Sequence, residues 1–289
     1  MGGSTSSAAA DGRSAGLPPA HEPPPTRAAR GWALRLLPLG LVAAGVAIFA
    51  LAAHKSSNRP PSGSGLVAHR AARSSPDPVG RRRIYLGRSV LGRRLHAVAL
   101  GDLDNERSVL VVGDIHGDES AGVPIAQRLA SARPPREGLL LVVKDLNPDG
   151  VAAGTRQNAH GVDLNRNFPW RWRPLGVRGD LYSGPRPLSE PEARAARALI
   201  LRRRPSTAIW FHQPLGLVDE SGGSVAVERR FAKLSGLPLH RLPRYPGSVA
   251  SWQNHRLHHT TAFVVELPAG RLSSSSVATY ADAVVDLAT

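Results

Sequence analysis

Short apolar segments alternate with amphipathic segments through the last two-thirds of the chain. Continuous apolar runs of about five residues, rich in branched side chains, indicate strands that are buried on both faces. Runs or alternating patterns of this kind predict strands at 83–87, 94–101, 108–112, 139–143, 207–211 and 260–267. Segments with apolar residues on one face predict helices at 121–130, 189–204, 225–234, 249–257 and 273–287. This alternation predicts an α/β domain with a mostly parallel or mixed sheet, beginning near Gly80.

Two local signals refine this picture. Ser189 precedes Pro191 and an acidic first turn, so we expect Ser189 to be the N-cap of the helix that ends near Arg204. Residues 147–187 show no helical or strand period, and they begin with Asn-Pro-Asp-Gly, which favours a turn. A loop of this length within a domain is usually functional.

The amino-terminal third has a different pattern. Residues 1–35, rich in Gly, Ser, Ala and Pro at first, are expected to form a disordered cytoplasmic tail, and 54–79 a flexible linker. Between them, 36–53 holds 18 uncharged residues behind several Arg, which favours a transmembrane helix or signal-anchor with the amino terminus inside. The alternative is a cleaved signal peptide and secretion. Either topology places the catalytic domain, 80–289, outside the cytoplasm.

Composition and charge narrow the function only slightly. The 289 residues include no Cys, which excludes disulfides, thiolate metal sites and a cysteine nucleophile. The net charge is +15, and all but three of the 37 basic residues are Arg. Because these Arg residues are spread along the chain, we attribute most of the charge to genome composition rather than to a polyanion site. No nucleic-acid module is visible, so we expect no nucleic-acid partner, and we expect a monomer.

The candidate chemistry begins where the strand 108–112 ends. His116 and Glu119 follow this strand at a spacing of three, and the carboxyl ends of such strands are where open α/β sheets place their sites. An imidazole and a carboxylate are ligands that zinc accepts. The alternative is a polar turn whose side chains contact only solvent.

Two more polar residues end apolar strands. His212 follows Ala-Ile-Trp-Phe, and Glu266 lies within Phe-Val-Val-Glu-Leu-Pro, where an unpaired carboxylate is costly. With His116 and Glu119 they complete a catalytic zinc set, in which Glu266 takes a proton from water and passes it to the leaving nitrogen. The alternatives are a satisfied core histidine and a salt-bridged structural glutamate.

The loop 147–187 supplies a candidate substrate clamp. Arg156 and Arg166 present planar guanidinium groups that match a carboxylate or a developing oxyanion. The alternative is that these arginines pair with Asp149 and Asp163 and only make the loop rigid.

These residues form part of a larger set of motifs. His116-Gly-Asp-Glu119, Asn147-Pro-Asp-Gly150, Gly161-Val-Asp-Leu-Asn-Arg-Asn-Phe168, Ser189-Glu-Pro-Glu192, His212 and Glu266 occur in the order found in zinc carboxypeptidases. The sequence resembles this family over about 85–289. The resemblance implies a three-layer α/β/α fold around a mixed, roughly eight-stranded sheet, with one zinc ion at the carboxyl ends of the strands.

The resemblance also implies roles for individual residues. His116, Glu119 and His212 are the expected zinc ligands, and Glu266 is the expected general base and acid. Arg156 is expected to stabilise the oxyanion, and Asn165 with Arg166 to bind the substrate carboxylate. Asp163 is expected to orient His116. Tyr245 lies beside Pro-Gly, unlike the mobile Tyr of digestive carboxypeptidases, and receives no role.

Within the family, the sequence is most similar to the bacterial branch that includes murein tripeptide amidases and γ-D-glutamyl-diaminopimelate peptidases. The similarity lies in residues 154–169, the His212-Gln-Pro-Leu-Gly segment and residues 246–252. It implies hydrolysis of short cell-wall peptides at the γ-D-glutamyl-diaminopimelate bond or at a C-terminal residue. The alternatives are a zinc-dependent deacylase of small N-acyl amino acids and an anchored, non-catalytic wall-binding module.

Overall fold

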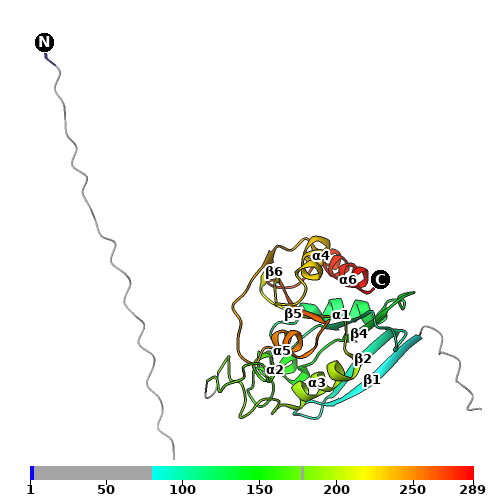
Figure 1. Ribbon diagram of the computed structural model, residues 1–289. Coiled ribbons are helices and arrows are strands. Elements are labelled where there is room, and N and C mark those ends of the chain that lie inside the picture. The colour runs from blue at the N-terminus through cyan, green and yellow to red at the C-terminus, as the bar shows by residue number, and fades with distance from the viewer. Residues whose placement is uncertain (3–79, 177–178) are drawn as a thin grey trace, which may run out of the picture. The chain divides into compact units, whose positions relative to one another are not determined.

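A mixed sheet of eight strands forms the centre of the fold (Figure 1). The structure is a computed structural model that describes residues 1–2, 80–176 and 179–289. The expected transmembrane helix at 36–53 and the linker at 54–79 lie outside the described residues, as does the expected tail beyond residue 2. Among the helices of the described ranges, none has the length and apolar character needed to cross a bilayer.

The strands occur in the spatial order β1-β2-β4-β3-β5-β8-β6-β7. Their bounds are β1 Gly80–Arg88, β2 Arg94–Gly101, β3 Ser108–Val112, β4 Leu139–Val143, β5 Thr207–His212, β6 Leu215–Asp219, β7 Leu239–His240 and β8 Thr261–Pro268. The central strands β4, β3, β5 and β8 are parallel. β2 pairs antiparallel with β1 and with β4, and β6 pairs antiparallel with β8 but parallel with β7. The expected mixed sheet of about eight strands is therefore confirmed.

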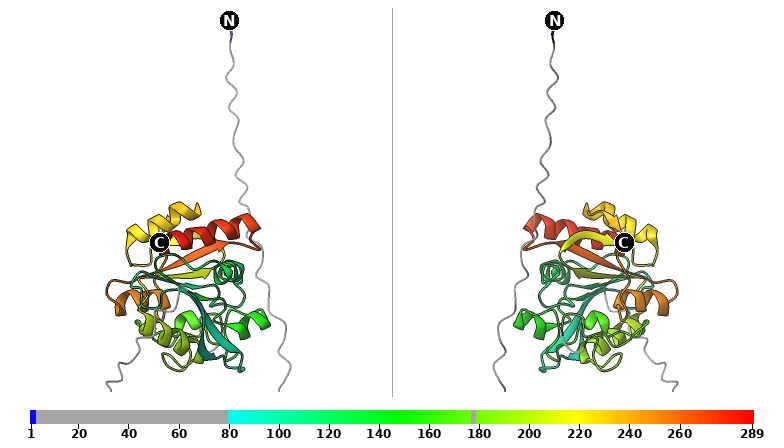
Figure 2. Two further views of the ribbon diagram at one scale, coloured as in Figure 1. Left: turned by 90° about the vertical axis from the view of Figure 1, so that its right-hand side faces the viewer. Right: turned by 90° about the vertical axis from the view of Figure 1, so that its left-hand side faces the viewer.

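Helices cover both faces of the sheet (Figures 1 and 2). Their bounds are α1 Gly122–Ser131, α2 Pro148–Ala153, α3 Pro191–Arg203, α4 Val225–Ser235, α5 Val249–Arg256 and α6 Ser274–Ala288, with a 3-10 turn at Leu164–Arg166. One hydrophobic core joins α1, α4 and α6 to the sheet, and a second joins α3 and α5 to the opposite face. Because alternate residues of the buried strands enter different cores, these strands have continuous apolar sequences.

The structure corrects two expectations about helix starts. Glu190, not Ser189, is the N-cap of α3, because the Ser189 hydroxyl donates to the Glu190 carboxylate at 2.6 Å instead of capping the helix. The segment 147–187 is not wholly irregular, since Asn147 caps α2 by accepting from the Gly150 N–H at 3.0 Å. Asn followed by Pro therefore starts a short helix here rather than an isolated turn.

Two strands were not predicted from the sequence. β6 contains Gly216 at φ 66° and is buried only at its last two residues, so it lacks a continuous apolar run. It forms because it pairs antiparallel with β8, Leu217 opposite Glu266. β7 has only two residues and pairs with the end of β6.

Two glycines allow the loops at the carboxyl ends of the strands to pack closely. A Cβ atom on Gly117, in the turn after β3, would lie 2.0 Å from the carbonyl carbon of Gly150 in α2. A Cβ atom on Gly247, which has φ +76°, would lie 2.0 Å from the Arg166 carbonyl oxygen. Both contacts need a residue without a side chain. They bring the turn after β3, the long loop and the segment before α5 to one edge of the sheet.

Candidate active site and metal centre

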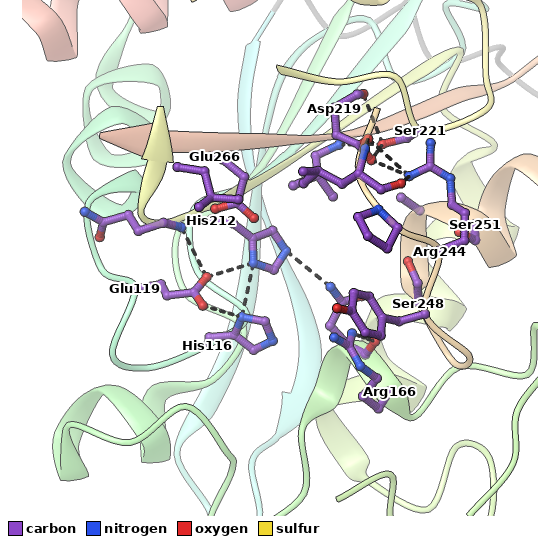
Figure 3. Close-up of a pocket in the computed structure, with 18 of the residues that line it drawn as sticks. His116, Glu119, Arg166, His212, Asp219, Ser221, Arg244, Ser248, Ser251 and Glu266 are labelled. Carbon is purple, nitrogen blue, oxygen red and sulfur yellow. Dashed lines mark hydrogen bonds and ion pairs between the residues drawn. The ribbon is translucent and has the colours of Figure 1, made fainter. Parts of the chain in front are cut away.

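Three candidate ligands meet at the carboxyl ends of β3 and β5 (Figure 3). His116 and Glu119 lie in the turn between β3 and α1, and His212 is the last residue of β5. The Nδ1 atoms of His116 and His212 are 3.1 Å apart. The Glu119 carboxylate lies 3.0 Å from His116 Nδ1 and 2.8 Å from His212 Nδ1. Both imidazoles are almost fully buried, at 1% and 3% exposure.

This donor set fits a zinc ion. Zinc binds imidazole nitrogen and carboxylate oxygen at about 2.0–2.1 Å in a tetrahedron, which places neighbouring ligand atoms about 3.3 Å apart. The separations of 2.8–3.1 Å are close to that value. Three protein ligands of this type leave the fourth position for water or substrate, as in catalytic rather than structural zinc sites.

Asp163 is completely buried and fixes the orientation of His116. Its Oδ1 lies 3.0 Å from His116 Nε2, and because a carboxylate can only accept, Nε2 is the protonated nitrogen at this contact. Burial lowers the pKa of His116, but the charges and hydrogen bonds of Asp163 and Glu119 outweigh burial and raise this pKa to about 9. The contact leaves Nδ1 of His116 facing Glu119 and His212, which is the orientation that a metal ligand needs.

Arg156 joins the ligand group to Asp163. Its Nη1 donates to Glu119 at 2.6 Å and its Nε donates to Asp163 at 3.0 Å, while the guanidinium also lines the cleft. The pairing with Asp163 that the sequence left open as a structural alternative is therefore present. Asp149, the other suggested partner, pairs with Arg93 instead.

Glu266 lies directly beside His212, because the two residues are register partners in the parallel pair β5–β8. Its Oε2 atom is buried and has no hydrogen-bond partner among the described residues. Burial raises the pKa of Glu266, the Glu119 charge raises it further, and His212 opposes the shift. A carboxyl group with these properties, facing the cleft beside the metal ligands, suits proton transfer.

Asn165 and Arg166 form the floor of the cleft next to the ligands. The Asn165 side-chain amide lies 3.4 Å from His212 Nε2 and accepts from the Val249 N–H at 2.9 Å. Arg166 donates from Nη1 to the Asn165 carbonyl at 2.8 Å and stacks on the Tyr245 ring at 4.4 Å. Its Nε–H is buried without a partner among the described residues.

The far wall of the cleft was missed by the sequence reasoning. Asp219, Ser221, Arg244 and Ser251 line it together with Val264 (Figure 3). Asp219, Ser221 and Arg244 lie outside the motifs that indicated the metal centre. The only signal in the sequence is that Asp219 ends a short apolar segment, as His212 and Glu266 do.

Comparison with known proteins gives the class of this protein. The zinc carboxypeptidase family model matches residues 136–215, a range that contains Arg156, Asn165, Arg166 and His212. Murein peptide amidase A of Escherichia coli K12 is 35% identical over 193 residues, which are 62% of this chain and 79% of that protein. The chain belongs to the zinc carboxypeptidase family and is a zinc-dependent peptide hydrolase.

Other relatives agree with this assignment. Murein peptide amidase A of Vibrio campbellii is 34% identical over 199 residues, covering 63% of this chain and 77% of that protein. The crystal structure of murein-tripeptide amidase from Escherichia coli O157 matches with a TM-score of 0.58 at 31% identity, covering 75% of this chain and 94% of that one. Carboxypeptidase A from Helicoverpa armigera, at 16% identity and a TM-score of 0.61, shares the fold over 73% of this chain and 69% of its own.

Proposed function

We propose that this enzyme hydrolyses short murein peptides at the amide bond between γ-D-glutamate and diaminopimelate. The observation that supports the proposal most is that one cleft contains the three ligands, a buried unpartnered carboxyl and a group of cationic donors. Two relatives that match at 34–35% identity over 77–79% of their own length are murein peptide amidases, which favours a wall-derived peptide as the substrate.

Each residue of the cleft has a part in this reaction. His116, Glu119 and His212 would hold the zinc ion, which would supply Lewis acidity for the hydrolysis. Glu266 lines the cleft, takes the proton from the attacking water and passes it to the leaving nitrogen. The raised pKa of Glu266 favours the second transfer, because a carboxyl group that is easily protonated holds the proton until the nitrogen accepts it.

Two groups of donors bind the substrate in this proposal. Arg156 stabilises the negative charge that develops on the carbonyl oxygen, from a position where Glu119 and Asp163 already hold its guanidinium. Asn165 and Arg166 bind the carboxylate of the residue on the leaving side. Arg166 suits this task because it lines the cleft and forms no ion pair with a protein carboxylate among the described residues, although burial lowers the pKa of its guanidinium against the opposing charge of Asp163.

The test is cleavage of a defined peptide. Purified full-length enzyme with zinc is incubated with L-Ala-γ-D-Glu-meso-diaminopimelate, and mass spectrometry should detect L-Ala-D-Glu and free diaminopimelate. Cleavage of N-acyl amino acids with the tripeptide left intact would instead support a deacylase. Absence of stoichiometric zinc, together with no turnover of either substrate class, would favour a non-catalytic wall-binding module.

We also propose that the catalytic domain acts outside the cytoplasm. The support is the uncharged stretch 36–53 behind several Arg, which favours an uncleaved anchor with its amino terminus inside. External protease added to intact cells should degrade the domain and leave a cytosolic control protein intact. Complete protection of the domain until the cells are lysed would contradict the proposal, and recovery of the domain in the medium would indicate a cleaved leader.

A further inference from the structure

The cleft continues beyond Glu266 to a charged wall. Figure 3 shows Asp219, Ser221 and Arg244 across the cleft from the three ligands, and all of them line it. The wall joins two segments that are distant in the sequence, the end of β6 and the loop that precedes α5. No step of the reaction described above uses these residues.

A buried carboxylate holds Arg244 in place. Asp219 accepts from the Ser221 hydroxyl at 2.6 Å, from the Leu242 N–H at 2.8 Å and from Arg244 Nη1 at 2.8 Å. Arg244 Nη1 also donates to the Leu242 carbonyl, and Nη2 donates to the Glu220 carbonyl. Both oxygens of Asp219 are therefore occupied, so Asp219 orients the arginine rather than contacting a ligand itself.

Arg244 nevertheless retains N–H donors that contact no protein oxygen among the described residues. Its side chain is 29% exposed and lines the cleft. A guanidinium has five N–H donors, and the contacts to protein oxygens use Nη1 and one hydrogen of Nη2. Among the described residues, the Nε–H and the second Nη2 hydrogen have no acceptor. Two neighbouring donors on one guanidinium suit the two oxygens of a carboxylate.

The position of this wall relative to Glu266 follows from the geometry of β8. Val264 and Glu266 both line the cleft and point to the same face of β8, because they are two residues apart on one strand. Two residues of a strand span about 7 Å. Asp219 follows Val218, the register partner of Val265, so the wall lies near Val264, about one extended side chain beyond Glu266.

We propose that Arg244 binds a second carboxylate at the end of the side chain of the leaving residue. Its ligand class is a C-terminal diamino dicarboxylic acid, with one carboxylate at Asn165 and Arg166 and the other at Arg244. This proposal rests on the proposed function, because diaminopimelate is such a residue. Lysine carries its side-chain ammonium on the same carbon as diaminopimelate but lacks the second carboxyl group, so it leaves these donors of Arg244 unpaired.

The experiment compares two tripeptides that differ only at the third residue. Full-length enzyme with zinc is assayed on L-Ala-γ-D-Glu-X, where X is meso-diaminopimelate or L-lysine, and kcat/KM is measured for each. We expect the wild type to prefer diaminopimelate by roughly ten- to a hundredfold, which is the usual contribution of a hydrogen-bonded charge pair. Arg244→Gln should bring this ratio close to one.

Arg241→Gln is the matched control. Arg241 lies three residues away in the same loop, pairs with the Glu220 carboxylate, is 71% exposed and does not line the cleft. This variant should keep the wild-type ratio. Zinc content and melting temperature establish that Arg244→Gln is folded. Arg244→Lys retains the positive charge without the paired N–H donors of a guanidinium, so it should give an intermediate ratio of kcat/KM values.

Binding of the free amino acids separates this proposal from the proposed function. Calorimetry with meso-diaminopimelate and with L-lysine should show preference for the former in the wild type and in Arg241→Gln, and loss of preference in Arg244→Gln. If the wild type cleaves neither tripeptide, the proposed function fails, and the binding preference still decides the role of Arg244. An unchanged preference in Arg244→Gln, or none in the wild type, would overturn the proposal.

Discussion

The two walls of the cleft share one arrangement, in which a buried aspartate forms an ion pair with an arginine. On the ligand side Asp163 holds Arg156, and on the far side Asp219 holds Arg244. In both pairs the aspartate is buried and the guanidinium reaches the cleft. A paired aspartate lowers the cost of bringing an arginine into a partly buried site, because the two charges compensate one another.

The partners of the two aspartates differ. Asp163 also contacts His116, so its arginine is connected to the candidate zinc ligands. Besides Arg244, Asp219 contacts the Ser221 hydroxyl and the Leu242 N–H, and it contacts none of the three candidate zinc ligands. The ligand-side pair is therefore suited to the chemistry that all substrates share, and the far pair to the choice among substrates. A third pair, Asp149 with Arg93, lies outside the cleft and serves as a structural reference.

The largest expected effect lies between the two walls. Glu266→Gln should lower kcat by about a thousandfold, since the amide cannot transfer the proton. Zinc should stay bound, because Glu266 is not among the three candidate ligands. Steady-state kinetics and zinc analysis by mass spectrometry measure both. Wild-type kcat in this variant would remove Glu266 from its role, and loss of zinc would mean that it belongs to the ligand set.

The second-largest expected effect is a difference in zinc affinity between variants of the two walls. Asp163→Asn should weaken zinc binding about ten- to a hundredfold, because the amide orients His116 poorly and does not raise its basicity. Asp219→Asn is the matched variant on the other wall and should keep the wild-type affinity. Competition with a chelator gives both dissociation constants. Equal loss of affinity in the two variants would mean that the walls are not independent.

The same Asp219→Asn variant should show a defect in substrate binding. Arg244 loses its charged partner, so we expect KM for the diaminopimelate tripeptide to rise about tenfold while kcat changes little. Initial rates over a range of tripeptide concentrations separate the two constants. A fall in kcat at unchanged KM would place Asp219 in the chemical step rather than in substrate recognition.

The smallest effect on activity is expected for the reference pair. Asp149 accepts from Ser89 and from the Leu91 N–H, each at 2.9 Å, and pairs with Arg93. Asp149→Asn should lower the free energy of unfolding by about 2 kcal/mol at pH 7, since the charge-assisted bonds are weakened. Zinc content and kcat/KM should match the wild type. Urea titrations measure the stability change.

The stability difference should also depend on pH. Burial raises the pKa of Asp149, but the Leu91 N–H, Arg93 and Ser89 together lower it below its ordinary value. A lowered folded-state pKa means that the stabilisation is present above the unfolded-state pKa of about 4 and disappears as the pH falls through the folded-state value. Asp286→Asn, which breaks the exposed pair with Arg230, should change stability by less than about 1 kcal/mol at any of these pH values. A larger loss from Asp286 than from Asp149 would contradict this ranking.

The amino-acid sequence by itself determined the class of fold and the candidate ligands. Buried parallel strands need apolar residues on both faces, so β3, β4, β5 and β8 were visible as continuous runs. A polar residue at the end of such a run has few structural explanations, which made His116, His212 and Glu266 recognisable. The spacing of these motifs also indicated the family, which comparison with known proteins confirmed.

Only the tertiary structure decided what these residues contact. The sequence left open whether Arg156 pairs with a carboxylate or faces the cleft, and the structure shows that it does both. β6 has no continuous apolar run, and it forms because β8 offers an unpaired edge. That pairing places Asp219 near Val264 and brings Arg244 into the cleft. Contacts between segments that are distant in the sequence depend on how strands pair across the sheet. The local pattern of apolar and polar residues does not determine that pairing.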